Sequence, residues 1–265
     1  MDKSIVITGA SSGIGKEAAE VFAEKGYRLF LAARRIDRLR EMEPHLAEAG
    51  SPFCCSGEYD LSIPGSGSRL VEDALERLGS VDVLLCNAGY GIFGPVENVD
   101  PAEMQRMLQV NYLSAYESIL AILPHFKTRR QGHIVLVSSI NGKKGMAGSA
   151  AYSATKFAQT GLGEALWAEL KDFGISVSVI CPGFTETEFH RTASRTSGIK
   201  AKRSSRGQSS REVAEAIEKA VRKKQREVHL TFSGKLILLI ERFSNNLAMR
   251  IMAKAAQKDP LRKME

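Results

Sequence analysis

The segment that decides the fold is Thr8-Gly9-Ala10-Ser11-Ser12-Gly13-Ile14-Gly15, close to the start of the sequence. The apolar run Ile5-Val6-Ile7 precedes it and is typical of a buried strand, and residues 13–25 follow it with the spacing of an amphipathic helix. Glycines at a strand-to-helix turn let backbone N–H groups approach a phosphate, and the dipole of the following helix favours negative charge. The segment therefore predicts a dinucleotide-binding turn.

Beyond this turn, short apolar runs alternate with helical patterns. Strands are expected at 28–33, 52–59, 81–86, 133–138 and 176–181, and helices at 37–49, 66–78, 101–126 and 150–173. This order predicts an α/β fold of the Rossmann type, a doubly wound parallel sheet with helices on both faces. We expect one domain over 1–265.

The C-terminal part of the chain departs from this rhythm. Residues 190–211 are rich in Ser, Thr, Arg, Lys and Gly and are expected to form a mobile loop on the substrate side. A helical pattern returns at 211–224, and an apolar and basic extension covers 228–265.

Composition excludes several classes of protein. The chain has 265 residues, 43% of them hydrophobic and 25% charged, which is ordinary for a globular protein. No stretch approaches the roughly 20 apolar residues of a membrane-spanning helix, and the first residues leave no room for a secretory signal. Four scattered cysteines form no CxxC pair and five histidines show no metal-ligand spacing, so we expect a cytoplasmic protein without structural metal.

Three further motifs follow the glycine-rich turn in order. They are Asn87-Ala88-Gly89 after the predicted strand 81–86, Tyr152 with Lys156 at the start of a helix, and Pro182-Gly183 followed by Thr187. With TGxxxGxG at Thr8, they resemble the NNAG, YxxxK and PGxxxT motifs of the short-chain dehydrogenase/reductase family, with Cys86 replacing the first Asn. The resemblance covers roughly residues 3–187 and implies a nicotinamide-dependent oxidoreductase.

Tyr152 is the expected catalytic residue. Lys156 shares its helix face, and a free Tyr with a pKa of about 10 is a poor base near neutral pH. We therefore expect the ammonium of Lys156 to lower the pKa of Tyr152, which then acts as general acid/base. The resemblance implies that Ser139, thirteen residues before Tyr152, orients the substrate oxygen, and that Asn111 completes a catalytic tetrad through water. Ser138 is expected to have a structural role.

Cofactor choice is indicated by Ala32-Ala33-Arg34-Arg35 at the end of the second predicted strand. An acidic residue there would accept the ribose 2′-hydroxyl of NAD, whereas Arg suits a 2′-phosphate. NADP(H) is therefore expected; the alternative is that Arg34 and Arg35 are only solvated charges. The resemblance implies that Asp60 holds the adenine amino group, Asn87 lies near the ribose and Thr187 contacts the carboxamide. The expected cofactor-binding residues are Gly9, Ser11, Ser12, Gly13, Ile14, Gly15, Arg34, Arg35, Asp60, Leu61, Asn87, Ala88, Gly89, Tyr152, Lys156, Pro182, Gly183 and Thr187.

The substrate end is less specific. The loops after the strands contain Tyr90, Phe93, Met146, Phe184 and Phe189, which suggest an apolar pocket. The long tail loosely resembles those of family members acting on lipophilic ketones or alcohols, with steroid-, retinoid- and acyl-type substrates. The resemblance also implies a homodimer or homotetramer built on the Tyr-bearing helix and the preceding long helix.

The net charge of +7 is concentrated in residues 188–265, which carry 19 Lys and Arg against 8 Asp and Glu. Three interpretations stay open: a solvated face beside a subunit interface or pocket cover, peripheral contact with a membrane surface, or attraction of an anionic substrate handle such as a phosphate or CoA-like carrier. No nucleic-acid partner is expected, because no recognition motif accompanies the charge. The alternative functions are an NADP(H)-binding regulatory or scaffold protein and a cofactor-retaining isomerase or epimerase.

Overall fold

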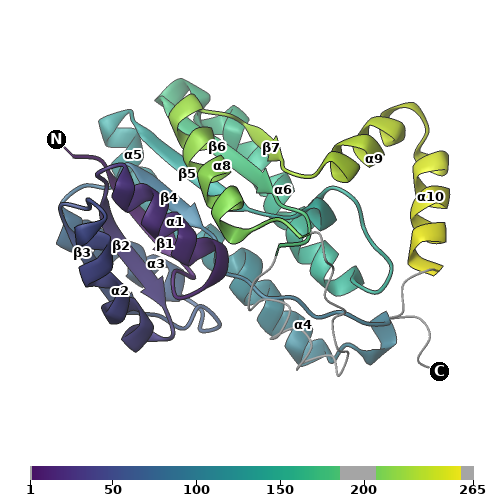
Figure 1. Cartoon of the computed structure of the whole chain (residues 1–265), viewed down its shortest axis with the longest axis horizontal. Coiled ribbons are helices and arrows are strands. Elements are labelled where there is room, and N and C mark those ends of the chain that lie inside the picture. Colours follow the sequence, from purple (N-terminus) through teal and green to yellow (C-terminus); the bar gives the residue numbers. More distant parts are fainter. Residues whose placement is uncertain (1, 186–206, 258–265) are drawn as a thin grey trace.

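The computed structural model describes residues 2–185 and 207–257, except for the side chains of 232–233, 241 and 252–257, and its centre is a single parallel sheet (Figure 1). The sheet has the order β3-β2-β1-β4-β5-β6-β7. Its strands are β1 (Ser4–Thr8), β2 (Arg28–Ala33), β3 (Cys54–Glu58), β4 (Val83–Cys86), β5 (Gly132–Val137), β6 (Ile175–Cys181) and β7 (Glu227–His229). Every neighbouring pair is parallel, so the predicted doubly wound Rossmann-type sheet is confirmed.

Helices cover both faces of the sheet because successive strand side chains point to opposite sides. Ile5 and Ile7 of β1 belong to one buried core, whereas Val6 belongs to the other. The first core is closed by α1 (Gly13–Glu24), α2 (Ile36–Glu48) and α8 (Ser210–Lys223), and the second by α3 (Ser66–Leu78), α5 (Ser114–Arg129) and α6 (Ala150–Leu170). The polar turns at the carboxyl ends of the strands are thereby held on a rigid frame.

The helix expected at 101–126 is interrupted. It consists of α4 (Pro101–Leu108), a π-helical segment η2 (Gln109–Leu113) and α5. Asp100 caps its start, since the Asp100 carboxylate accepts a hydrogen bond from the Ala102 backbone N–H at 2.8 Å. Short 3₁₀ turns lie at η1 (Val96–Asn98), η3 (Ile140–Gly142) and η4 (Lys171–Phe173).

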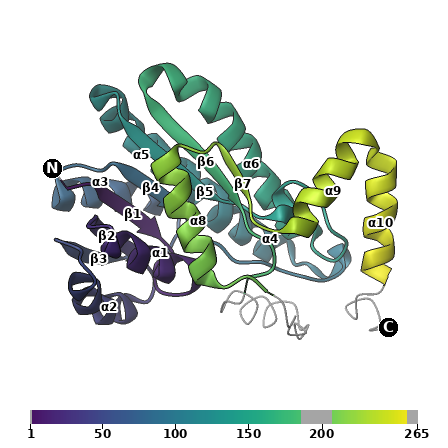
Figure 2. The ribbon, with the colours of Figure 1, turned by 45° about the horizontal axis from the view of Figure 1, so that its top comes forward.

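The C-terminal extension is more regular than its sequence suggested. It contains the unpredicted edge strand β7 and two helices, α9 (Phe232–Phe243) and α10 (Asn245–Gln257), which form a hairpin at one end of the molecule (Figures 1 and 2). The expected mobile loop lies outside the described residues up to position 206. Among the described residues, no helix is both long and apolar enough to cross a membrane.

Candidate active site

The turn between β1 and α1 has the shape of a phosphate cradle. Gly9 and Gly13 have φ values of +69° and +55°, in the left-handed region that favours glycine. A Cβ atom on Gly15 would lie 2.3 Å from the carbonyl oxygen of Gly9, so a side chain would fill this space. Helix α1 begins without a side-chain cap on its N–H groups and without an acidic residue in its first turn. These residues therefore fit the pyrophosphate of a dinucleotide.

Thr8 links this turn to the end of β4. The Thr8 hydroxyl accepts hydrogen bonds from the backbone N–H groups of Asn87 and Ala88, both at 3.0 Å. The Asn87 amide donates to the Thr8 carbonyl at 2.9 Å. A Cβ atom on Gly89 would lie 3.5 Å from the ammonium of Lys156. The predicted motif Asn87–Gly89 thus lies between the glycine turn and Lys156. The Thr8 hydroxyl, for which the sequence indicated no role, holds it there.

Arg35 lies against the glycine turn. Its guanidinium donates hydrogen bonds to the hydroxyls of Ser12 at 2.9 Å and Ser11 at 3.1 Å. Arg34 is exposed and acts electrostatically on Asp60. Partial burial disfavours the charged carboxylate of Asp60, but two hydrogen bonds from Ser62 outweigh this effect and lower its pKa. The Asp60 carboxylate is therefore charged near neutral pH.

Two other expected cofactor positions have different surroundings. The side chain of Leu61 packs into the core that also contains Leu70, and it is 7% exposed. Gly183 follows β6, where its backbone N–H donates to the Gln208 side chain at 3.2 Å, and the Pro182 carbonyl accepts from Ile140 at 2.9 Å. Thr187, like Phe189, lies outside the described residues.

Tyr152 and Ser139 meet at the carboxyl end of β5. Tyr152 is 7% exposed, and burial raises the pKa of its phenol, while a hydrogen bond with the Ser139 hydroxyl opposes the rise. The neighbouring Ser138 donates instead to the Lys156 carbonyl at 3.0 Å, which confirms its structural role.

Lys156 is directed at the protein rather than at the phenol. Its ammonium donates to the Val137 carbonyl at 2.9 Å and the Gln159 side-chain oxygen at 2.8 Å, and lies 5.8 Å from the centre of the Tyr152 ring. Burial lowers the pKa of Lys156 to about 7. The expected lowering of the Tyr152 pKa by this ammonium is therefore wrong for the pair as it stands, because desolvation acts on both groups.

Gln159 was missed by the sequence analysis. It is 1% exposed, and its side-chain nitrogen has no hydrogen-bond partner in the described part of the chain. Its one sequence signal is the spacing of three residues after Lys156, which places both on one helix face.

Asn111 lies within the π-helical segment η2 and is fully buried. Its side chain accepts from the Tyr90 N–H at 2.9 Å, donates to the Tyr90 carbonyl at 2.9 Å and donates to the Thr155 hydroxyl at 3.0 Å. These hydrogen bonds connect the loop after β4 to α6, the helix that carries Tyr152 and Lys156. A local π-helix is a frequent feature of functional sites.

Two aromatic side chains, Tyr90 and Phe93, lie close to Tyr152. The ring centres of Phe93 and Tyr152 lie 5.5 Å apart, and Tyr90 and Phe93 pack against a small cluster that contains Ile92 and Tyr152. Phe184 is 37% exposed.

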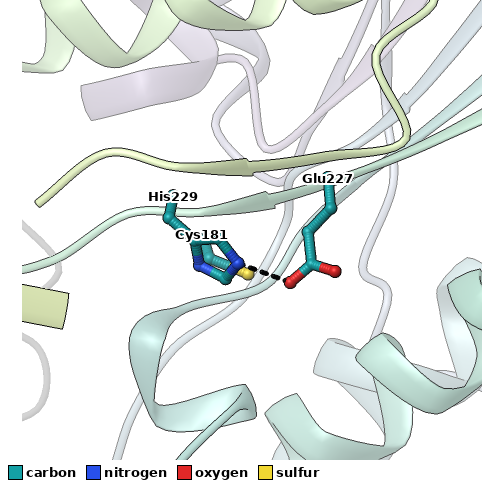
Figure 3. Close-up of side chains that lie close together, drawn as sticks. All are labelled: Cys181, Glu227 and His229. Carbon is teal, nitrogen blue, oxygen red and sulfur yellow. Dashed lines mark ion pairs between the residues drawn. The ribbon is translucent and has the colours of Figure 1, made fainter. Parts of the chain in front are cut away.

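Figure 3 shows a cluster that no sequence spacing predicted, formed by Cys181, Glu227 and His229. Their possible ligand atoms lie within 4.8 Å of one another. The Glu227 carboxylate is 2.6 Å from His229 and 3.0 Å from the Lys143 ammonium, and these partners lower its pKa to about 2. Since the carboxylate is already paired, we describe the cluster as a network that fastens β7 to Lys143 in the loop after Ser139, with Cys181 of β6 beside it.

The fold, the glycine cradle and the Tyr152–Ser139 contact define a nucleotide-binding α/β oxidoreductase. The family model of short chain dehydrogenases matches residues 3–198, and the chain belongs to this family. It is 34% identical to dehydrogenase/reductase SDR family member 7B of Mus musculus, covering 96% of this chain and 81% of that protein. It is 35% identical to retinol dehydrogenase 8 of Homo sapiens, covering 71% of this chain and 60% of that protein.

Solved structures give the same result. An alcohol dehydrogenase from Thermococcus sibiricus, complexed with 5-hydroxy-NADP, has a TM-score of 0.77 at 30% identity and covers 87% of this chain and 96% of its own. A short-chain dehydrogenase from Sphingobium yanoikuyae, in complex with NADPH, has a TM-score of 0.80 at 26% identity, covering 93% and 95%. A family member from Burkholderia phymatum, in complex with NAD, has a TM-score of 0.76 at 25% identity, covering 86% and 88%. Since both cofactors occur, the choice rests on this chain's own residues.

Proposed function

We propose that the protein is an NADP(H)-dependent oxidoreductase that reduces a carbonyl or oxidises an alcohol, with Tyr152 as general acid/base. The observation that carries the proposal is the hydrogen-bonded pair Tyr152–Ser139, with Lys156 beside it and within reach of Gly89. This arrangement joins a proton donor to the nucleotide cradle.

When bound in the glycine cradle, NADP(H) would supply the hydride for reduction or accept it in oxidation. Ser139 holds the substrate oxygen, and Tyr152 gives it a proton during reduction or removes one during oxidation. Burial keeps the phenol protonated, which is the form needed for carbonyl reduction. Lys156 lies beside the phenol with its ammonium held by Val137 and Gln159, and it would contact the bound cofactor. Asn111 holds the Tyr90 loop in place and completes the tetrad through water.

Arg35 supports the preference for NADP(H). Its guanidinium, fixed by Ser11 and Ser12, offers charge and planar donors to a 2′-phosphate, and Arg34 adds a second charge. We expect Arg35→Ala to raise KM for NADPH at least tenfold and to leave KM for NADH nearly unchanged. Arg40→Ala, a change of an exposed arginine in α2, is the matched control. Equal losses with both cofactors would contradict this role.

A lipophilic substrate of steroid, retinoid or acyl type is the favoured class, because aromatic rings line the approach to Tyr152 and the chain is similar to a retinol dehydrogenase. We also propose a homodimer or homotetramer built on α5 and α6, where Tyr116, Leu120 and Phe157 are exposed. A cytoplasmic location stays a prediction.

The test is a screen of NADPH oxidation over ketones, aldehydes and 3-oxoacyl compounds. We expect net consumption of NADPH with at least one apolar carbonyl compound and none with the Tyr152→Phe variant. A regulatory protein or an isomerase would consume no NADPH. Equal rates for both forms would overturn the mechanism.

A further inference from the structure

The hairpin of α9 and α10 projects from the main body in both ribbon views (Figures 1 and 2). Helix α10 contacts α9, and Ala248 at this contact region is fully buried. The first turn of α9 is anchored beside the active site, since a Cβ atom on Gly234 would lie 2.8 Å from the Ile140 side chain. A hydrogen bond of 2.8 Å from the Lys144 ammonium to Asn245 holds the junction of the two helices.

Helix α9 of the hairpin carries an apolar face that is open to solvent. This face consists of Leu236, Leu239 and Phe243, each at least 46% exposed. Leu247, Met249 and Ile251 of α10 are exposed as well. Phe243 is 82% exposed. Leu236, Leu239 and Phe243 follow the spacing i, i+3, i+7 and so form one stripe along α9. Removing such an apolar stripe from water lowers the free energy of the system.

The hairpin also carries basic side chains, two of them on α9 beside this stripe. Lys235, Arg242 and Arg250 are exposed and make no ion pair within the described part of the chain. With 3.6 residues per turn, Lys235 and Arg242 lie next to Leu239 on the same side of α9. Their long side chains can keep their charges at a polar interface while neighbouring apolar groups enter a less polar phase.

We propose that the α9–α10 hairpin docks the protein onto an anionic lipid surface. The apolar face would enter the region of the acyl chains, and Lys235, Arg242 and Arg250 would contact anionic headgroups. A second copy of the chain fits less well, because a two-fold interface centred on this stripe would bring Lys235 and Arg242 close to their own copies. Docking would also turn the region around Ile140, next to Ser139, towards the lipid. That corollary rests on the proposed function, whereas the docking itself does not.

The experiment is sedimentation of the full chain with vesicles of phosphatidylcholine alone or mixed with phosphatidylserine, without substrate. We expect binding to the mixed vesicles that weakens with added salt. Leu239→Ser/Phe243→Ser and Lys235→Glu/Arg242→Glu should each lower the partition coefficient at least tenfold. Val96→Ser and Lys219→Glu, which change an exposed apolar residue and an exposed cation elsewhere, should leave it unchanged.

Circular dichroism of each variant checks that it is folded, and this control does not depend on the oxidoreductase proposal. Failure of the unaltered chain to bind the anionic vesicles would overturn the docking proposal. So would equal binding by the hairpin variants. Dissociation of an oligomer by Leu239→Ser/Phe243→Ser, seen in analytical ultracentrifugation without any vesicle binding, would assign the face to a second copy and also overturn it.

Discussion

At the scale of single residues, the environment of Lys156 decides how the site handles protons. Its ammonium is buried and has two acceptors in the described part of the chain, the Val137 carbonyl and the Gln159 side chain. Burial favours the neutral amine, and a hydrogen-bond acceptor favours the ammonium. Gln159 is therefore a positioning residue that holds the Lys156 ammonium, and we expect it to influence the acidity of that ammonium.

Substitutions of Gln159 should shift the pH profile in opposite directions. Gln159→Leu removes an acceptor and lowers the pKa of Lys156 further, whereas Gln159→Glu adds a carboxylate and raises it. If the protonated lysine is the active form, activity is lost as pH rises through this pKa. The basic limb of kcat/KM should then move to lower pH in Gln159→Leu and to higher pH in Gln159→Glu. Profiles that coincide with the original would exclude this role, whatever the change in stability.

Gly15 tests the glycine cradle. A methyl group there would lie 2.3 Å from the Gly9 carbonyl oxygen and 2.6 Å from the Asn87 amide, so the turn must move. We expect Gly15→Ala to weaken NADPH binding at least tenfold in fluorescence titration and to lower the free energy of unfolding by about 1–3 kcal/mol. Gly161→Ala is the matched control. No atom lies within 4 Å of its added Cβ, and it replaces a helical glycine, so it should be neutral or stabilising.

At the scale of elements, β5 and β6 share a buried polar pair. His133 is 5% exposed and lies 2.8 Å from the Ser178 hydroxyl, and burial lowers the pKa of His133 to about 4. The unfolded chain therefore binds more protons than the folded protein between pH 4 and the ordinary histidine pKa of about 6.5. Stability contributed by the neutral form is present above that range and is lost as pH falls through it.

His133→Gln should reduce this acid sensitivity. Between pH 7 and pH 5 the original protein should lose about 2 kcal/mol more of its free energy of unfolding than the variant, measured by urea denaturation. His45→Gln, at an exposed position of α2, should retain the original pH dependence. If His133→Gln and the original protein lose the same amount, the burial argument fails.

The sequence predicts an element when the residues that determine it are close together in the chain. Apolar runs predicted the strands from β1 to β6 and the spacing of glycines predicted the glycine turn, and the structure confirms both. Strand β7 has three residues at the sheet edge, too few to show a hydrophobic period. The ion pair between Glu227 and Lys143 joins segments that are distant in the sequence. The direction of the Lys156 ammonium depends on the Val137 carbonyl and on desolvation, which spacing alone does not reveal.

At the scale of the whole molecule, the described parts form one sheet with two faces covered and one projecting hairpin (Figure 1). The glycine cradle, the end of β4 and Tyr152 all lie at the carboxyl ends of the strands, as expected for ligand sites of doubly wound folds. The hairpin is attached at the same end of the sheet through Gly234 and Asn245. A nucleotide site and an exposed apolar surface are therefore neighbours in one rigid frame.

We propose that Tyr152 transfers a proton to the oxygen of a carbonyl group whose carbon receives the hydride of NADPH. The direct measurement uses NADPH deuterated at the transferable position and the carbonyl compound that oxidises it fastest. Product deuteration is followed by mass spectrometry, and cofactor affinity by fluorescence. We expect deuterium on the product carbon with the original protein, and a rate at least a thousandfold lower with Tyr152→Phe at nearly unchanged NADPH affinity. Deuterated product formed at the original rate by Tyr152→Phe would exclude Tyr152 as the proton donor.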